Sequence, residues 1–172
     1  MLRRLKRFAT GLALVAWFWP ASRALAQPKT APAIIKVYAG SDGSAHLTDA
    51  SGHELVVPKE QDQVDISQAA IAKDQQSVGW LAEFPNPDST YAIPLILIVY
   101  RAGKIRRFGD GLLIVDWRFL ADGGQIAFYS NTVHSDLAPH YELRDVRSGR
   151  LLGKWDGPRS EKAPRWTREL KD

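Results

Sequence analysis

Short apolar runs separated by turn-forming clusters recur along most of the chain. The runs are rich in Val, Ile and aromatic residues, which favour strands. The clusters between them contain Gly, Asp, Asn, Pro and Ser, which tolerate the backbone angles of tight turns. This pattern predicts an all-β domain. The expected strands are 34–39, 45–48, 53–57, 64–71, 77–84, 93–100, 105–108, 112–119, 125–130, 141–145 and 150–155.

Residues 93–100 are apolar at nearly every position, which is typical of a strand buried on both faces. Residues 64–71 are ambiguous, because Val64 and Ile66 alternate whereas the Ala-rich stretch 69–72 could also form a helical turn. The β-prone run that follows at 77–84 favours the strand interpretation.

The first 26 residues have a different pattern. A basic front at Arg3, Arg4, Lys6 and Arg7 precedes an apolar run over 8–19, and small residues follow at 24–26. This order predicts a secretory signal peptide at 1–26, cleaved after Ala26. Retention as an anchor is the alternative, but the run is shorter than the roughly 18–20 residues that a spanning helix needs.

We therefore expect a periplasmic or secreted protein with no membrane span after cleavage. Residues 27–33 carry two prolines and no periodic pattern, so they are expected to be a flexible lead-in. A single all-β domain is expected over 34–157, followed by a charged C-terminal tail at 158–172 in which Trp166 could dock on a surface. The chain has no cysteine, so an apolar core has to stabilise the fold without disulfides.

The leader also changes the meaning of the net charge. The whole chain has 23 basic and 19 acidic residues, but the leader holds five of the basic ones and no acidic residue. The remaining chain has 18 basic and 19 acidic residues. Without the leader, the charge of the chain lacks the basic character that nucleic-acid binding requires. We therefore expect no nucleic-acid partner.

Part of the pattern occurs twice. Residues 71–81 align with 119–129 at an offset of 48, each with an apolar position, a turn containing Asp, and then apolar, small and aromatic positions. Residues 98–105 align with 143–151 at an offset near 46. A repeat of 40–50 residues made of four short strands is the period of a β-propeller blade.

The second copy carries a family resemblance. Residues 119–128, Phe-Leu-Ala-Asp-Gly-Gly-Gln-Ile-Ala-Phe, and the hairpin at 141–150 resemble the WD40-like repeats of TolB-type periplasmic propellers. The resemblance covers 64–157, or about two blade-like units, although the first copy lacks the turn glycine after Asp74. A closed propeller takes at least four blades. The resemblance to two blades therefore implies small antiparallel blade-like sheets. These could be arranged as an open stack (a partial propeller), as a sandwich, or as one share of an oligomeric ring.

Two groups of residues are candidates for binding. His134, Asp136 and His140 lie in the longest polar loop of the repeat region, and loops carry function on rigid scaffolds. Arg106 and Arg107 belong to a basic hairpin that could dock an acidic partner or anionic lipid. The alternatives are a hydrolase or metal-binding His/Asp loop, and a solvated hairpin that protects a sheet edge.

A third cluster, His46, Asp49 and His53, flanks one turn and contains zinc or copper ligand types, but solvated turn residues are the simpler interpretation. The sequence has no phosphate-binding glycine loop, zinc-protease helix or nucleophile elbow, so we assign no catalytic residues, metal or cofactor.

These observations predict an exported, non-catalytic binding module that contacts a protein, or as a second possibility a glycan, through loops at one end of its sheets. The alternatives are an exported hydrolase or metal-binding protein that uses the His/Asp loop, and a structural subunit that forms homo-oligomers.

Overall fold

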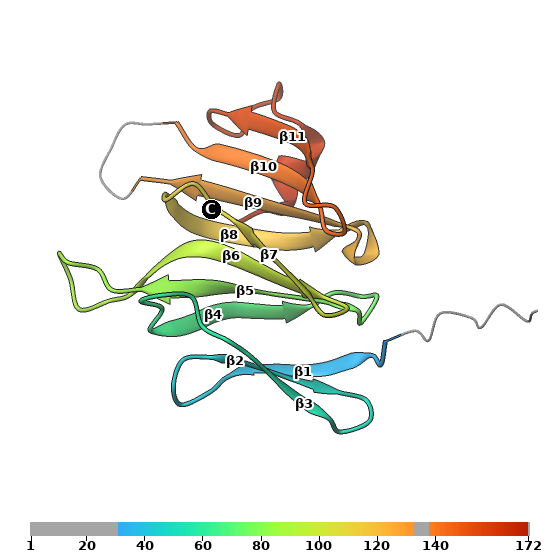
Figure 1. Ribbon diagram of the computed structural model, residues 1–172. Coiled ribbons are helices and arrows are strands. Elements are labelled where there is room, and N and C mark those ends of the chain that lie inside the picture. Colours follow the sequence, from blue (N-terminus) through green and yellow to red (C-terminus); the bar gives the residue numbers. More distant parts are fainter. Residues whose placement is uncertain (1–30, 133–137, 172) are drawn as a thin grey trace, which may run out of the picture.

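The computed structural model describes residues 31–132 and 138–171, which form one three-stranded and two four-stranded antiparallel sheets stacked face to face (Figure 1). Residues 1–26 lie outside the described residues, so the signal peptide stays a prediction. Sheet A contains β1 (Ile34–Ala39), β2 (Ala45–Asp49) and β3 (Glu54–Val57), in that order. Sheet B has the order β4 (Asp65–Ile71), β5 (Ser77–Phe84), β6 (Ile93–Arg101) and β7 (Lys104–Phe108). Sheet C has the order β8 (Leu113–Leu120), β9 (Gln125–Asn131), β10 (His140–Asp145) and β11 (Leu151–Asp156).

The all-β prediction is confirmed, with each strand close to its predicted position. The ambiguous segment forms strand β4. Its alternation is broken by a register shift between Ser67 and Ala70, where Gln68 has a positive φ of 49°. A β-bulge therefore produces the irregular pattern that resembled a helical turn.

The two aligned segments adopt the same topology. Sheets B and C are both four-stranded meanders, in which each strand pairs with the next one along the chain. Strand β8 begins 48 residues after β4, and β9 begins 48 residues after β5. The first apolar runs of the chain supply only three strands, so sheet A stops at β3 while sheets B and C each have a fourth strand.

Sheet B buries both of its faces. On one face Val78, Trp80 and Ile98 pack against sheet A in a core with Leu47 and Val57. On the other face a second core joins sheets B and C, and its sheet B members include Leu81, Leu97 and Val99. The two-sided burial predicted for the run 93–100 is confirmed at its centre, where Leu97, Ile98 and Val99 are all buried.

The close approach of sheets B and C depends on a glycine. A Cβ atom added to Gly79 of β5 would lie 2.6 Å from the ring of Trp117 on β8. The corresponding residue of the second copy, Ala127, is also small, and its side chain is fully buried on the other face of sheet C. The small position in the repeat therefore marks a place where packing leaves little room.

The C-terminal segment covers the outer face of sheet C. A short 3-10 helix, η2 (Arg165–Glu169), places Trp166 and Leu170 in a third apolar cluster with Tyr129 and Tyr141. The backbone amide of Lys171 donates to Asp116 of β8 at 2.5 Å, and Arg159 donates to the carbonyl of Leu170. Trp166, proposed from the sequence as a docking side chain, is half-buried against its own chain.

We predict that Leu170→Ala lowers the free energy of unfolding by about 2–4 kcal/mol, because it removes a buried side chain and leaves a cavity. Urea unfolding followed by tryptophan fluorescence measures this change. The exposed neighbour Glu169 is the control, and Glu169→Ala should stay within about 0.5 kcal/mol of the parent. Equal effects of the two substitutions would show that the tail is not part of the core.

Candidate functional site

The basic hairpin of β6 and β7 divides its charges between two faces. Neighbouring strand residues point to opposite sides of a sheet, and the register places Lys104, Arg106 and Phe108 on the side of sheet C, with Ile105 and Arg107 on the side of sheet A. The side chains of Arg106 and Arg107 therefore leave the strand in opposite directions, although both residues border one groove between β7 and the β10–β11 hairpin.

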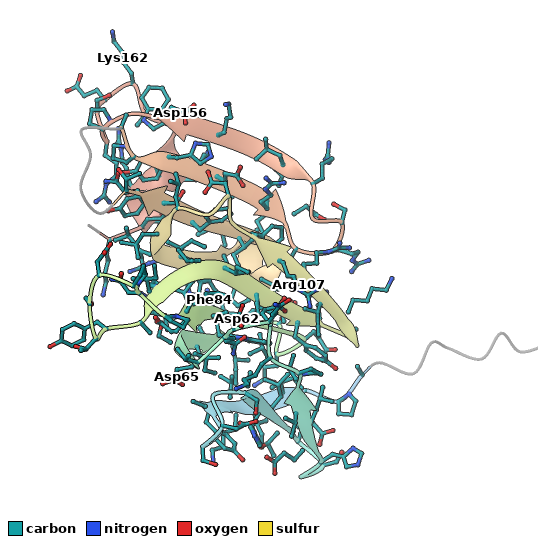
Figure 2. All side chains as sticks on the ribbon, turned by 60° about the vertical axis from the view of Figure 1, so that its left-hand side comes forward. Asp62, Asp65, Phe84, Arg107, Asp156 and Lys162 are labelled. Carbon is teal, nitrogen blue, oxygen red and sulfur yellow. The ribbon has the colours of Figure 1, made fainter. Side chains whose placement is uncertain are left out.

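Each of these arginines already has partners within the chain. Arg106 Nε donates to the carbonyls of Val146 and Arg147, both at 3.1 Å. Arg107 Nε donates to Glu60 Oε1 at 2.7 Å, a bond that raises the pKa of Arg107. Figure 2 shows Arg107 directed toward the segment around Asp62, which also contains Glu60. Arg107 thus ties sheet B to the connection between β3 and β4.

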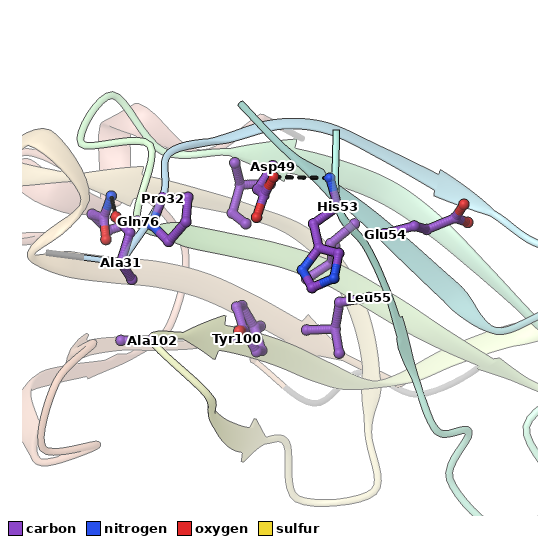
Figure 3. A pocket seen from close by; sticks show the side chains of 11 residues that line it. Ala31, Pro32, Asp49, His53, Glu54, Leu55, Gln76, Tyr100 and Ala102 are labelled. Atoms are coloured by element: carbon purple, nitrogen blue, oxygen red, sulfur yellow. Dashed lines mark hydrogen bonds between the residues drawn. The ribbon is translucent and has the colours of Figure 1, made fainter. Parts of the chain in front are cut away.

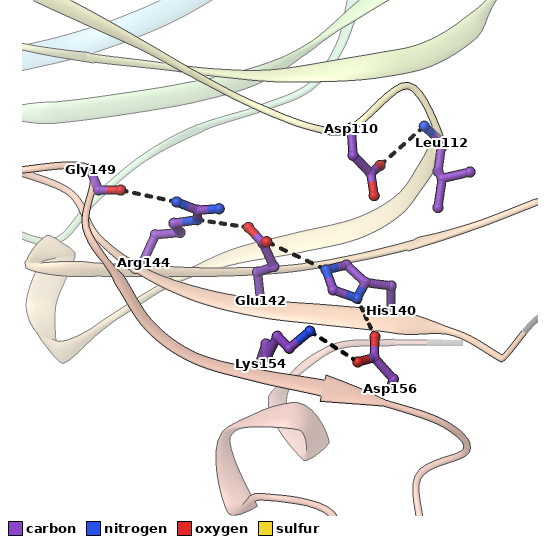
Figure 4. A network of polar contacts seen from close by, with 8 residues as sticks. All are labelled: Asp110, Leu112, His140, Glu142, Arg144, Gly149, Lys154 and Asp156. Carbon is purple, nitrogen blue, oxygen red and sulfur yellow. Dashed lines mark hydrogen bonds and ion pairs between the residues drawn. The ribbon is translucent and has the colours of Figure 1, made fainter.

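His140 is the described member of the predicted His/Asp loop. It lies at the start of β10, where Nδ1 contacts Asp156 of β11 and Nε2 lies 3.4 Å from Glu142 Oε1 (Figure 4). Glu142 also accepts from Arg144 Nε at 2.7 Å, and Lys154 lies 3.4 Å from Asp156. Positive and negative groups alternate along this network, so its charges largely cancel.

The environment of His140 has two opposing effects. Partial burial of the ring would lower the pKa of His140, but the contacts with Asp156 and Glu142 outweigh burial and raise it above its ordinary value of 6.5. The hydrogen bond from His140 in turn lowers the pKa of Asp156. Both shifts favour the charged forms of the two groups, so the contact is an ion pair whenever the His140 imidazole is protonated.

An open groove of about 380 Å³ lies between β7 of sheet B and the β10–β11 hairpin of sheet C. Arg106, Phe108 and Arg144 line it, and the Arg144 guanidinium lies 5.8 Å from the centre of the Phe108 ring. Arg106 thus borders a basic groove. His140, at the other end of β10, belongs to the network next to Arg144.

His134 and Asp136 lie outside the described residues. The hydrolase or metal alternative for this loop therefore stays a prediction. Within 31–132 and 138–171, no three His, Asp or Glu side chains gather closely enough to hold a metal ion. In the same ranges, the ring nitrogens of His46 and His140 contact carboxylates, and neither imidazole is paired with a hydroxyl nucleophile.

The cluster at the β2–β3 hairpin does not converge on one point. His46 lies on the outer face of sheet A, where Nδ1 is 2.5 Å from Glu54 Oε1. Tyr38 donates to the same oxygen at 2.7 Å, and this bond raises the pKa of Tyr38. The hydrogen bonds from His46 and then Tyr38 lower the pKa of Glu54. Asp49 instead accepts from the backbone amides of Ser51 and His53 and shapes the turn.

A second groove, of about 240 Å³, opens between sheets A and B (Figure 3). Leu47 and Leu55 form its sheet A wall, Tyr100 of β6 faces them, and the β2–β3 hairpin with Asp49 and His53 stands at one end. Sequence reasoning did not identify this groove. The available signal was the count of apolar runs, because only three precede the first repeat whereas each repeat has four.

Neither a protein-family model nor a curated protein matches the chain. Among the described residues no helix has both the length and the apolar character needed to cross a bilayer. We therefore infer function from the geometry of the chain itself.

The His140 network makes a pH-dependent prediction. Because the folded pKa of His140 is raised, its stabilising contribution is fully present below the unfolded value of about 6.5 and is lost as pH rises through the folded pKa. We expect a folded pKa above 6.5 in an NMR titration, and Asp156→Asn should lower it. Asp122→Asn, at the opposite end of the sheets, is the control and should leave it unchanged. A His140 pKa below 6.5 in the parent would contradict the network.

Proposed function

We propose that the chain is an exported, non-catalytic binding module related to the WD40-like repeats of TolB-type propellers, and that its partner is a protein. The observation that carries this proposal is the stacking of two repeats with the same four-stranded topology. A stack of rigid sheets held together by two apolar cores is a scaffold on which connecting loops can present a binding surface.

The topology gives that surface a position. In each repeat the second strand ends and the third begins at the same end of the stack, as β5 with β6 and β9 with β10 show (Figure 1). The β5–β6 connection includes Tyr91, whose surface is 81% exposed. An exposed tyrosine is well suited to a protein contact, since it offers a rigid apolar ring and a hydroxyl group.

Self-association is the competing proposal, because the edges of an open stack could be completed by further copies. The ends of the stack support the monomeric arrangement. The tail covers sheet C, and the outer face of sheet A carries Lys36, Tyr38, His46 and Glu54, a charged surface poorly suited to packing against another sheet.

Site-specific photocrosslinking in the native cells tests the binding proposal. A photoreactive amino acid replacing Tyr91 should give a discrete adduct with one other protein. The same group replacing Lys73, an exposed residue in the β4–β5 turn at the opposite end of the sheets, should not. A lack of any adduct at Tyr91, or equal adducts at both positions, would contradict a binding surface at the loop end.

A further inference from the structure

Strand β3 ends sheet A at the position where sheets B and C each have one more strand. In sheet B the third strand, β6, is covered by β7, and in sheet C the third strand, β10, is covered by β11. Among the described residues nothing occupies the equivalent place beside β3. We propose that this edge binds an extended segment of a partner protein, in which apolar and basic residues alternate, as an added strand.

The backbone of β3 offers hydrogen-bonding groups to such a strand. The amide of Asp49 donates to the carbonyl of His53 at 3.0 Å, and the register then pairs Leu47 with Leu55 and Ala45 with Val57. Because hydrogen-bonded and non-hydrogen-bonded pairs alternate in antiparallel sheets, the N–H and C=O groups of Leu55 and Val57 face β2. Those of Glu54 and Val56 face the free edge.

The side chains at this edge are apolar and exposed. Leu55 and Val56 are 41% and 48% exposed, although both are in a regular strand. Strand β7, by contrast, carries Lys104, Arg106 and Arg107 along its free edge. Charged residues at an edge are a common means of preventing strand addition. The sequence of β3, Glu-Leu-Val-Val, has no basic residue.

The groove between sheets A and B would receive alternate side chains of the added strand. A residue next to Leu55 on the inner face would lie over Tyr100, which is only half-buried in the core of sheets A and B. This residue has to be apolar, because Leu47, Leu55 and Tyr100 surround the space (Figure 3).

The side chains on the opposite face of the partner strand are expected to be basic. Asp49 and Glu54 are among the lining residues and no Lys or Arg is, within the described part of the chain, and the Glu54 carboxylate itself lies on the outer face of sheet A with His46 and Tyr38. On the facing hairpin, Arg101, Lys104 and Arg106 point to sheet C, and Arg107 is neutralised by Glu60. Glu54 is held ionised by its hydrogen bonds from His46 and Tyr38. A basic residue opposite Glu54 forms a favourable cross-strand pair, and a second copy of β3 has none to offer.

The inference concerns a different surface from the Tyr91 loop, so each can fail alone. The probe is an acetylated and amidated eight-residue peptide alternating valine with lysine, and its control alternates valine with glutamate. In an NMR titration of the mature chain, we expect the lysine peptide to shift the amide resonances of Glu54 and Val56. The glutamate peptide should bind about tenfold more weakly or not at all.

Substitution of Val56 tests the backbone contact. Val56→Pro removes an N–H that points away from β2, which edge strands tolerate, and it should weaken binding of the lysine peptide at least about tenfold. Val56→Thr keeps the N–H and should stay within about twofold.

Glu54→Lys is a second variant that keeps the test decisive if the proline variant does not fold. It should reverse the binding preference, so that the glutamate peptide binds more tightly than the lysine peptide. Equal binding of both peptides, shifts confined to β7 or β11, or no binding to the parent would overturn the proposal. So would a dimer in light scattering that Val56→Pro dissociates, since a second copy would then occupy the edge.

Discussion

Both faces of sheet B have to be covered, because Val78 and Trp80 point to one side of β5 while Leu81 points to the other. The chain has no cysteine, so these two apolar layers are the main stabilising contacts between the sheets. Each layer determines the position of a neighbouring sheet. The close fit of Gly79 against Trp117 shows how tightly sheet C is held.

The need to cover apolar faces also determines how the stack ends on each side. Sheet C still has an apolar outer face, and the tail covers it with Trp166 and Leu170. Sheet A ends the stack differently, because its outer face is a polar network centred on Glu54. With both end faces closed in these ways, the incomplete part of the molecule is the free edge of β3, where an apolar groove remains beside Tyr100.

The positions of the strands were predictable because alternation and turn residues are local signals. The repeat also predicted that sheets B and C share one topology. Opposite directions for Arg106 and Arg107 could have been predicted too, since neighbours in a strand point to opposite faces. The partners of His140 could not, because they depend on the register of β10 with β11. The groove between sheets A and B could not be predicted either. It depends on how two sheets that share no strand pack against each other, which no local sequence pattern encodes.

We infer that β3 is an open strand edge in a monomeric chain, and amide hydrogen exchange measures this directly. In the chain by itself, the amides of Glu54 and Val56 should exchange rapidly, while those of Leu55 and Val57, which face β2, should be protected. Protection of Glu54 and Val56 to the same degree as Leu55 would mean that another strand already occupies the edge, and it would contradict the account.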